Sequence, residues 1–315
     1  MVDAVLNHMT NHPWYVTRKR GRVVESVLPR FGIHDFHTPE TANAWGREKL
    51  GSRCRHALPE LRTDLPYVQQ ELKNYLHGLV TLGIRGFRFD AAKHISHSFW
   101  SFALEGLPGC LNFGELIHTQ ASHYNPFLLE FMMATDFPFA ALIREAFSPD
   151  GDLRALLDPE SSDRAIWGPR SIRFANTHDF ARRGAGFKFF KLPSAQDRAL
   201  ANVFILGTNE GTPYLYYNDL KNPLVRNAMK FRHFFGAGED TLVYSDANTL
   251  IWRKGNYALI GIHKGGYPFS PAQPLATGLK QGCYHIPGMD GVLISSTGLW
   301  DQPVIPSRSA VFLVP

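Results

Sequence analysis

Three acidic residues each follow a short apolar segment that the sequence predicts as a β-strand. Asp90 ends the segment 84–90, and Glu115 and Asp179 follow later segments of the same kind. Acidic residues at the carboxyl ends of strands are typical of catalytic sites in α/β proteins. One ionised and one protonated carboxyl group can together cleave a glycosidic bond, as nucleophile and general acid. Each acid alone is better explained as a loop carboxylate, a helix cap or an ion-pair partner. The prediction of a catalytic site therefore depends on all three acids together.

An arginine accompanies the first of these acids. Side chains alternate along a strand, so Arg88 and Asp90 face one side of the segment while Phe87 and Phe89 face the other. A cluster of carboxylates near an arginine suits the cleavage of a glycosidic bond, in which one carboxylate stays ionised and another is kept protonated.

The elements that must position these residues alternate between strands and helices. Apolar residues at helical spacing predict helices at 66–83, 98–104, 127–132, 140–147, 195–206 and 223–235. Short strands are expected between them at 84–89, 110–113, 133–136, 172–175 and 213–217. This alternation predicts an α/β fold in which helices cover a parallel sheet.

Two other regions break the alternation. Residues 9–63 are irregular, with little helix expected. After residue 238 the sequence predicts a small β domain, with strands at 242–244, 249–253, 257–263, 292–295 and 310–314.

Composition excludes several classes of protein. The chain has 315 residues, 44% of them hydrophobic and 19% charged, which excludes intrinsic disorder. No apolar run reaches about 18 residues, so no membrane span is expected. The net charge of +5 is dispersed, which argues against nucleic-acid binding. Three cysteines without a CxxC pair predict neither a disulfide framework nor a zinc site. The 13% aromatic content suits a cleft that stacks on sugar rings, although most phenylalanines belong to the core.

Short blocks of the sequence resemble the α-amylase family of glycoside hydrolases, whose members are built on a (β/α)8 barrel. The four blocks, in order, are DAVLNH at 3–8, GFRFDAAKH at 86–94, FGELI at 113–117 and FANTHD at 174–179. Two further segments are similar to the family: LPEL at 58–61 and GTPYLYY at 211–217. The resemblance implies a catalytic barrel from residues 1–8 and 64–237, an inserted domain B at 9–63, and a C-terminal β-sandwich at 238–315.

The resemblance also implies residue roles. Asp90 is expected to be the nucleophile and Glu115 the general acid/base, while Asp179 binds sugar hydroxyls. Substrate-binding side chains are expected at His8, Arg88, Lys93, His94 and His178. A Lys-His pair at 93–94 favours an α-amylase over other members, and the LPEL block favours α-1,4-linked glucans.

A calcium ion is implied by the same resemblance. Its ligands would be Asn7, Glu60 and the carbonyl oxygen of His94, because hard cations take oxygen ligands. Relatives usually carry Asp in place of Glu60. Chloride is not expected, because Thr177 stands before His178 where chloride-binding relatives carry Asn.

The predicted barrel is incomplete. A full barrel needs eight strands and about 250 residues, whereas six strands are found here, equivalent to the third through the eighth. Because an open parallel sheet exposes edges and an apolar face, we expect a homo-oligomer that covers the opened side.

We expect a retaining enzyme that cleaves internal α-1,4 bonds of starch-like glucans or maltooligosaccharides. Two alternatives remain open: a catalytically weak α-glucan-binding protein, and an α-glucanotransferase or maltogenic enzyme of the same family.

Overall fold

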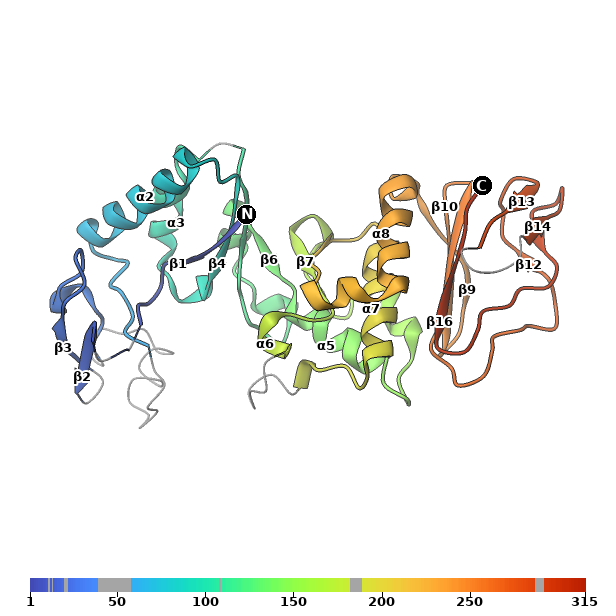
Figure 1. The fold of residues 1–315 in the computed structure, drawn as a ribbon, viewed down its shortest axis with the longest axis horizontal. Coiled ribbons are helices and arrows are strands. Elements are labelled where there is room, and N and C mark those ends of the chain that lie inside the picture. Colours follow the sequence, from blue (N-terminus) through green and yellow to red (C-terminus); the bar gives the residue numbers. More distant parts are fainter. Residues whose placement is uncertain are drawn as a thin grey trace. The chain divides into compact units, whose positions relative to one another are not determined.

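The computed structural model describes residues 1–10, 12, 14–19, 22–38, 58–107, 109–181, 189–286 and 292–315. These residues form two compact units, Met1–Ile117 with Tyr124–Thr135, and His118–His123 with Asp136–Pro315 (Figure 1). Cys54 and much of the predicted domain B lie outside the described residues. The expected limits of three domains remain a prediction.

A parallel sheet forms the centre of the first unit. Its strands are hydrogen-bonded in chain order: β1 (Val2–Val5), β4 (Gly86–Asp90), β5 (Leu111–Gly114) and β6 (Met133–Thr135). The register places Asp3 opposite Arg88. Each strand was expected from the sequence, with limits shifted by one or two residues.

Helices of the first unit pack on one face of this sheet. The bounds are α2 (Pro66–Thr81), α3 (His97–Leu104) and α4 (Pro126–Phe131). Phe87 and Phe89 are completely buried, and the Phe89 ring lies 4.9 Å from that of Trp100 on α3. This packing turns Arg88 and Asp90 to the opposite face, as strand alternation predicts.

Residues of the predicted domain B form a β-hairpin and a short 3₁₀ helix. The hairpin pairs β2 (Val16–Lys19) with β3 (Arg22–Ser26), and η1 spans Ile33–Asp35. The hairpin is a structure that the sequence analysis missed.

The second unit begins with the rest of the α/β alternation. Strands β7 (Ser171–Arg173) and β8 (Thr212–Pro213) pair in parallel. Its α-helices are α5 (Phe137–Ala146), α6 (His178–Ala181), α7 (Ala195–Gly207) and α8 (Pro223–Phe235). The predicted strand 213–217 is shorter than expected, because the chain turns into a 3₁₀ helix, η7 (Tyr217–Lys221). Four other 3₁₀ helices lie in the described chain: η2 (Ala92–His94), η3 (Ala121–His123), η4 (Leu153–Leu156) and η5 (Gly168–Arg170).

Two antiparallel sheets complete the second unit, in orange and red in Figure 1. The first contains β9 (Asp240–Ser245), β10 (Thr249–Lys254), β11 (Ala258–His263) and β16 (Ser309–Leu313). The second contains β12 (Leu275–Ala276), β13 (Gly282–Tyr284), β14 (Val292–Ile294) and β15 (Leu299–Trp300). The sequence predicted every strand here except the short β12, β13 and β15. Trp252 anchors the first sheet to α7, since its indole nitrogen donates to the Gly207 carbonyl at 2.9 Å.

The sequence analysis expected Asp136 to end the strand before helix α5. In the structure, Asp136 instead caps the start of α5. Its completely buried carboxylate accepts hydrogen bonds from the Phe139 and Ile166 amides, both at 3.1 Å, and from the Ser171 hydroxyl at 2.7 Å. Burial raises the pKa of Asp136 to about 6, although these hydrogen bonds and the Arg173 charge act to lower it. Asp136 is therefore a structural cap.

Stability should consequently depend on the pH through Asp136. A folded-state pKa above the unfolded value means that the contribution is complete below about pH 4 and is lost as the pH rises through about 6. We expect the wild type to lose about 3 kcal/mol of unfolding free energy between pH 4 and 8 relative to Asp136→Asn. Urea denaturation across this range measures the difference, with Asp150→Asn on the surface as the control. The prediction would be wrong if the difference in unfolding free energy between the wild type and Asp136→Asn stayed constant with pH.

No helix among the described residues is both long and apolar enough to cross a membrane.

Candidate active site

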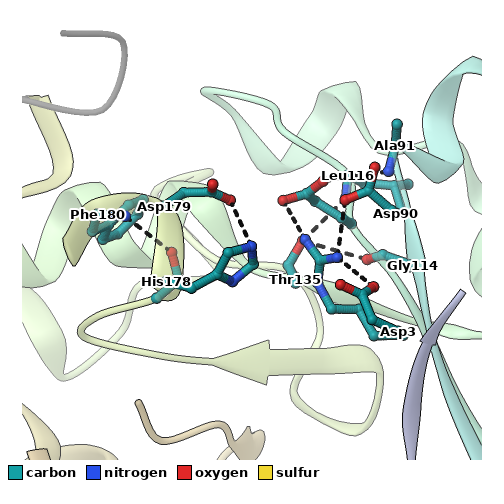
Figure 2. Close-up of polar contacts among 12 residues, drawn as sticks. Asp3, Asp90, Ala91, Gly114, Leu116, Thr135, His178, Asp179 and Phe180 are labelled. Atoms are coloured by element: carbon teal, nitrogen blue, oxygen red, sulfur yellow. Dashed lines mark hydrogen bonds and ion pairs between the residues drawn. The ribbon is translucent and has the colours of Figure 1, made fainter. Parts of the chain in front are cut away.

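Arg88 lies at the centre of a carboxylate cluster in the first unit. Its Nη1 atom lies 2.6 Å from Asp3 Oδ1 and 3.0 Å from Asp90 Oδ1, and its Nη2 atom lies 2.7 Å from Glu115 Oε1 (Figure 2). The three acids come from neighbouring strands: Asp3 from β1, Asp90 from β4, and Glu115 from the residue after β5. The structure therefore brings Asp90 and Glu115 together through a single guanidinium.

The cluster is strongly shielded from solvent. The exposed fraction of the side chain is 8% for Arg88, 11% for Glu115, 23% for Asp90 and 49% for Asp3. Burial alone would lower the pKa of Arg88, but the charges of Glu115, Asp3 and Asp90 outweigh it and raise that pKa. Arg88 therefore stays protonated and balances part of the negative charge at every ordinary pH.

The backbone after β4 supports Glu115. Ala91 has a φ of 49°, in the left-handed region, and its amide donates to Glu115 Oε2 at 3.3 Å (Figure 2). The Glu115 amide in turn donates to the Phe89 carbonyl at 2.8 Å. A left-handed conformation costs a non-glycine residue about 1 kcal/mol or more, and such strain is common at functional sites.

Three other predicted substrate-binding residues also lie in the first unit. His8 Nε2 is 3.8 Å from Asp90 Oδ2, so His8 lies beside the expected nucleophile. The ammonium group of Lys93 donates to the Ile117 carbonyl at 2.7 Å, which links the loops after β4 and β5. The His94 amide closes the short helix η2 by donating to the Ala91 carbonyl at 3.0 Å.

His178 and Asp179 lie in the second unit, at the start of helix α6. His178 Nε2 is 3.4 Å from Asp179 Oδ2, and both side chains are partly exposed (Figure 2). The Thr177 hydroxyl accepts from the Phe180 amide at 3.4 Å and caps this helix. The participation of His178 and Asp179 in one site with Asp90 and Glu115 remains a prediction.

Asp3 is a residue of the cluster to which the sequence analysis gave no role. It was recognised only as the first residue of a block. The register between β1 and β4 pairs Asp3 with Arg88 and makes it a partner of the guanidinium. Had β1 been recognised as the neighbour of β4, the role of Asp3 could have been predicted.

The predicted calcium ligands lie in the first unit. The Asn7 carbonyl accepts from the Leu61 amide at 2.8 Å, and His8 forms an antiparallel bridge with Glu60, so Asn7 and Glu60 lie on adjacent segments. His94 follows β4, the strand beside the one that leads to Asn7. No group of three or more His, Cys, Asp or Glu side chains in the described chain is arranged to hold a metal. The expected set instead combines an amide, a carboxylate and a backbone carbonyl, all oxygen donors that suit a hard cation.

Comparisons with known proteins point to one family, although no protein-family model matches the chain. An α-amylase of Aeromonas hydrophila is 28% identical over 320 residues, covering 84% of this chain and 68% of that protein. A 4-α-glucanotransferase of Thermotoga maritima is 30% identical over 169 residues, covering 51% of this chain and 36% of that protein. The chain thus spans about two thirds of the first relative and about a third of the second.

Solved structures agree with the expected fold. The α-amylase I of Eisenia fetida, solved as the wild type and as a mutant with maltohexaose, matches with TM-scores of 0.80 and 0.79. Each match is 16% identical and covers 98% of this chain and 79% of the other. The expected fold, an incomplete barrel followed by an antiparallel β domain, is therefore confirmed. Together, the curated relatives and the solved structures support the α-amylase family of glycoside hydrolases as the family that this chain resembles in sequence and fold.

Proposed function

We propose that this protein is a retaining hydrolase that cleaves internal α-1,4 bonds of starch-like glucans. The observation that carries the proposal is the bridge of Asp90 and Glu115 by one guanidinium, because a retaining mechanism needs its two carboxyl groups close together. Arg88 Nη1 lies 3.0 Å from Asp90 Oδ1 and so holds this carboxylate in place for attack on the anomeric carbon.

Glu115 then has to deliver a proton to the leaving oxygen. Its Oε1 atom accepts from Arg88 at 2.7 Å, and its Oε2 atom accepts from the Ala91 amide at the longer distance of 3.3 Å. Oε2 is therefore the atom that carries the proton in the first step. After a covalent bond forms between the sugar and Asp90, the same atom takes a proton from the attacking water.

The remaining predicted residues serve the sugar. His8 lies beside Asp90 and would hydrogen-bond the ring that is cleaved, as would His178. Asp179 would bind sugar hydroxyls in a distorted ring, and Lys93 and His94 would line the leaving-group side. Maltohexaose bound to the mutant Eisenia fetida enzyme supports a maltooligosaccharide as the ligand.

The assay uses soluble starch and maltohexaose with the wild type. We expect iodine staining to fall before many reducing ends appear, which marks internal cleavage, and the first products to be α-anomers by proton NMR. β-Anomers would overturn the retaining mechanism. Starch binding without cleavage would instead identify a glucan-binding protein.

A glucanotransferase is the second candidate, favoured by the similarity to the Thermotoga maritima enzyme. Barrel acids do not distinguish the two, because loops decide whether water or a sugar hydroxyl accepts the glycosyl group. Products longer than the maltohexaose supplied would favour the transferase.

We also propose a bound calcium ion. Asn7, Glu60 and the His94 carbonyl would hold it, and it would join the domain B segment to the barrel. The Arg18 guanidinium lies close enough to Glu60 for that carboxylate to raise the pKa of Arg18, although burial, the larger effect, lowers it. The positive charge of Arg18 thus offsets part of the negative charge that Glu60 would offer to a calcium ion.

Calcium should therefore stabilise the fold. At about 100 times its dissociation constant, the ion should add about 2.7 kcal/mol to the unfolding free energy. Calorimetric titration of chelator-treated protein measures binding, and thermal unfolding measures the shift. Glu60→Gln should lose both effects, while Glu25→Gln, an exposed carboxylate on β3, should keep them. Equal calcium effects in the two variants would contradict the assignment.

Self-association remains a prediction for the exposed side of β1. Met1, just before this strand, and Val5, at its end, are 58% and 41% exposed. We expect a second copy of the chain to cover them and sedimentation velocity to show a dimer or larger species. A single monomeric species at micromolar concentration would contradict this expectation.

A further inference from the structure

We propose that Asp219 is a positioning residue, which holds the segment that carries His178 and Asp179 in its working geometry. The proposal rests on the proposed function, because it assumes that these two residues bind the sugar. Asp219 lies in η7, after β8, and no motif of the sequence analysis included it.

The Asp219 carboxylate collects donors from two different elements. Its Oδ2 atom accepts from Asn176 Nδ2 at 3.2 Å and from Asn202 Nδ2 at 3.4 Å. Its Oδ1 atom lies 3.7 Å from Arg198 Nε. The Asp219 side chain is only 11% exposed, so these contacts are largely shielded from bulk solvent and are stronger than they would be on the surface.

Helix α7 provides the fixed end of this connection. Arg198 and Asn202 lie one turn apart on α7, and a continuous run of buried residues packs this helix into the core. Asn202 is 1% exposed, so its position is set by packing. The contacts with α7 therefore fix the position of the Asp219 carboxylate.

Asn176 is the other end of the connection. It stands two residues before His178 and three before Asp179, and it is 7% exposed. The next residue, Thr177, caps helix α6. A shift of Asn176 would thus move the first turn of α6, where both sugar-binding side chains lie.

Packing holds one side of this segment, since Phe174 and Ala175 are buried in the core. On the other side, a cavity of about 320 Å³ borders Ala175, Asn176, Arg198 and Asp219. On the side of the cavity, the hydrogen bond from Asn176 to Asp219 is therefore the contact that we expect to hold the segment. A displacement of about 1 Å at a catalytic site can cost about 100-fold in rate.

The test compares Asp219→Ala, Asn176→Ala and the double variant. Each single change should lower kcat on maltohexaose by about tenfold at 25 °C. The double variant should be no slower than the slower single variant, because both changes break the same contact. Asn209→Ala is the matched control: its side-chain amide donates to the Gly238 carbonyl at 2.8 Å and not to Asp219, so its loss should leave kcat within about twofold.

A second measurement does not depend on turnover. In a Glu115→Gln background, calorimetry should show that Asn176→Ala and Asp219→Ala each weaken maltohexaose binding by about tenfold, and that Asn209→Ala does not. Unchanged kcat and affinity, or additive losses in the double variant, would overturn the positioning role. If the wild type binds maltohexaose without cleaving it, the hydrolase proposal fails, while the binding measurement still decides the role of Asp219.

Discussion

Replacing Glu115 by glutamine is expected to lower kcat on soluble starch by about 10²- to 10⁴-fold, the range typical for a lost general acid and base. Glutamine keeps the shape of the side chain and can still accept from Arg88 with its amide oxygen. It has no proton to give to the leaving oxygen and cannot activate water in the second step. Both halves of the retaining mechanism should therefore slow down.

Binding and stability should change little in this variant. The affinity for maltohexaose, measured by calorimetry, should stay within about threefold of the wild type, because glutamine preserves the shape of the cleft. Reducing-end release measures the loss of rate. Glu105→Gln is the control, since its carboxylate is 75% exposed and pairs only with Lys73 among the contacts described. Equal, negligible release by the wild type and by Glu115→Gln would instead support the glucan-binding protein.

Replacing Arg88 by glutamine should damage both stability and activity. Three carboxylates contact the Arg88 guanidinium, and two of them are largely buried. Removing one partner of a buried ionic cluster leaves uncompensated charge and costs about 3–5 kcal/mol. We expect the unfolding free energy to fall by about 3 kcal/mol, because Asp3 is half exposed. We also expect kcat to fall by at least about 100-fold, since Asp90 and Glu115 lose the side chain that holds them in place.

Arg88→Lys separates the charge from the geometry. A lysine ammonium restores the positive charge but lacks the planar fork that reaches Asp90 with one nitrogen and Glu115 with the other. Stability should recover in part, while kcat stays low. Urea denaturation and starch assays measure the two quantities, and Arg85→Gln is the control, because Arg85 is exposed and donates, among the contacts of the described residues, to the backbone carbonyls of Val80 and Ile84. Full activity in Arg88→Lys would contradict the bridging role.

Local sequence signals predicted most of the elements. Proline at the start of α2 and α8, together with apolar residues at helical spacing, placed these helices almost to the residue. Longer strands such as β10 and β11 were also predictable, because they are long enough to show a pattern. The two-residue strands β12 and β15 were not, because so few residues carry no periodicity and their pairing is decided by distant partners.

The candidate site was only partly predictable for the same reason. Strand alternation was sufficient to place Arg88 and Asp90 on one face of β4. Asp136 was expected to end a strand but caps a helix, because its hydrogen-bond partners, Ile166 and Ser171, lie 30 or more residues away. Contacts between residues so far apart in the sequence cannot be predicted from a local pattern.

The sequence by itself determined the residue types that can do the chemistry and the order in which they follow their strands. The motif blocks, the α/β alternation and the β-rich C-terminal region are all local properties, so they can be read without a fold. Only the tertiary structure decided which carboxylates share Arg88, that Asp3 is one of them, and that Asp219 holds Asn176. Strand register and the packing of α7 create those contacts between residues far apart in the chain, and no local pattern encodes them.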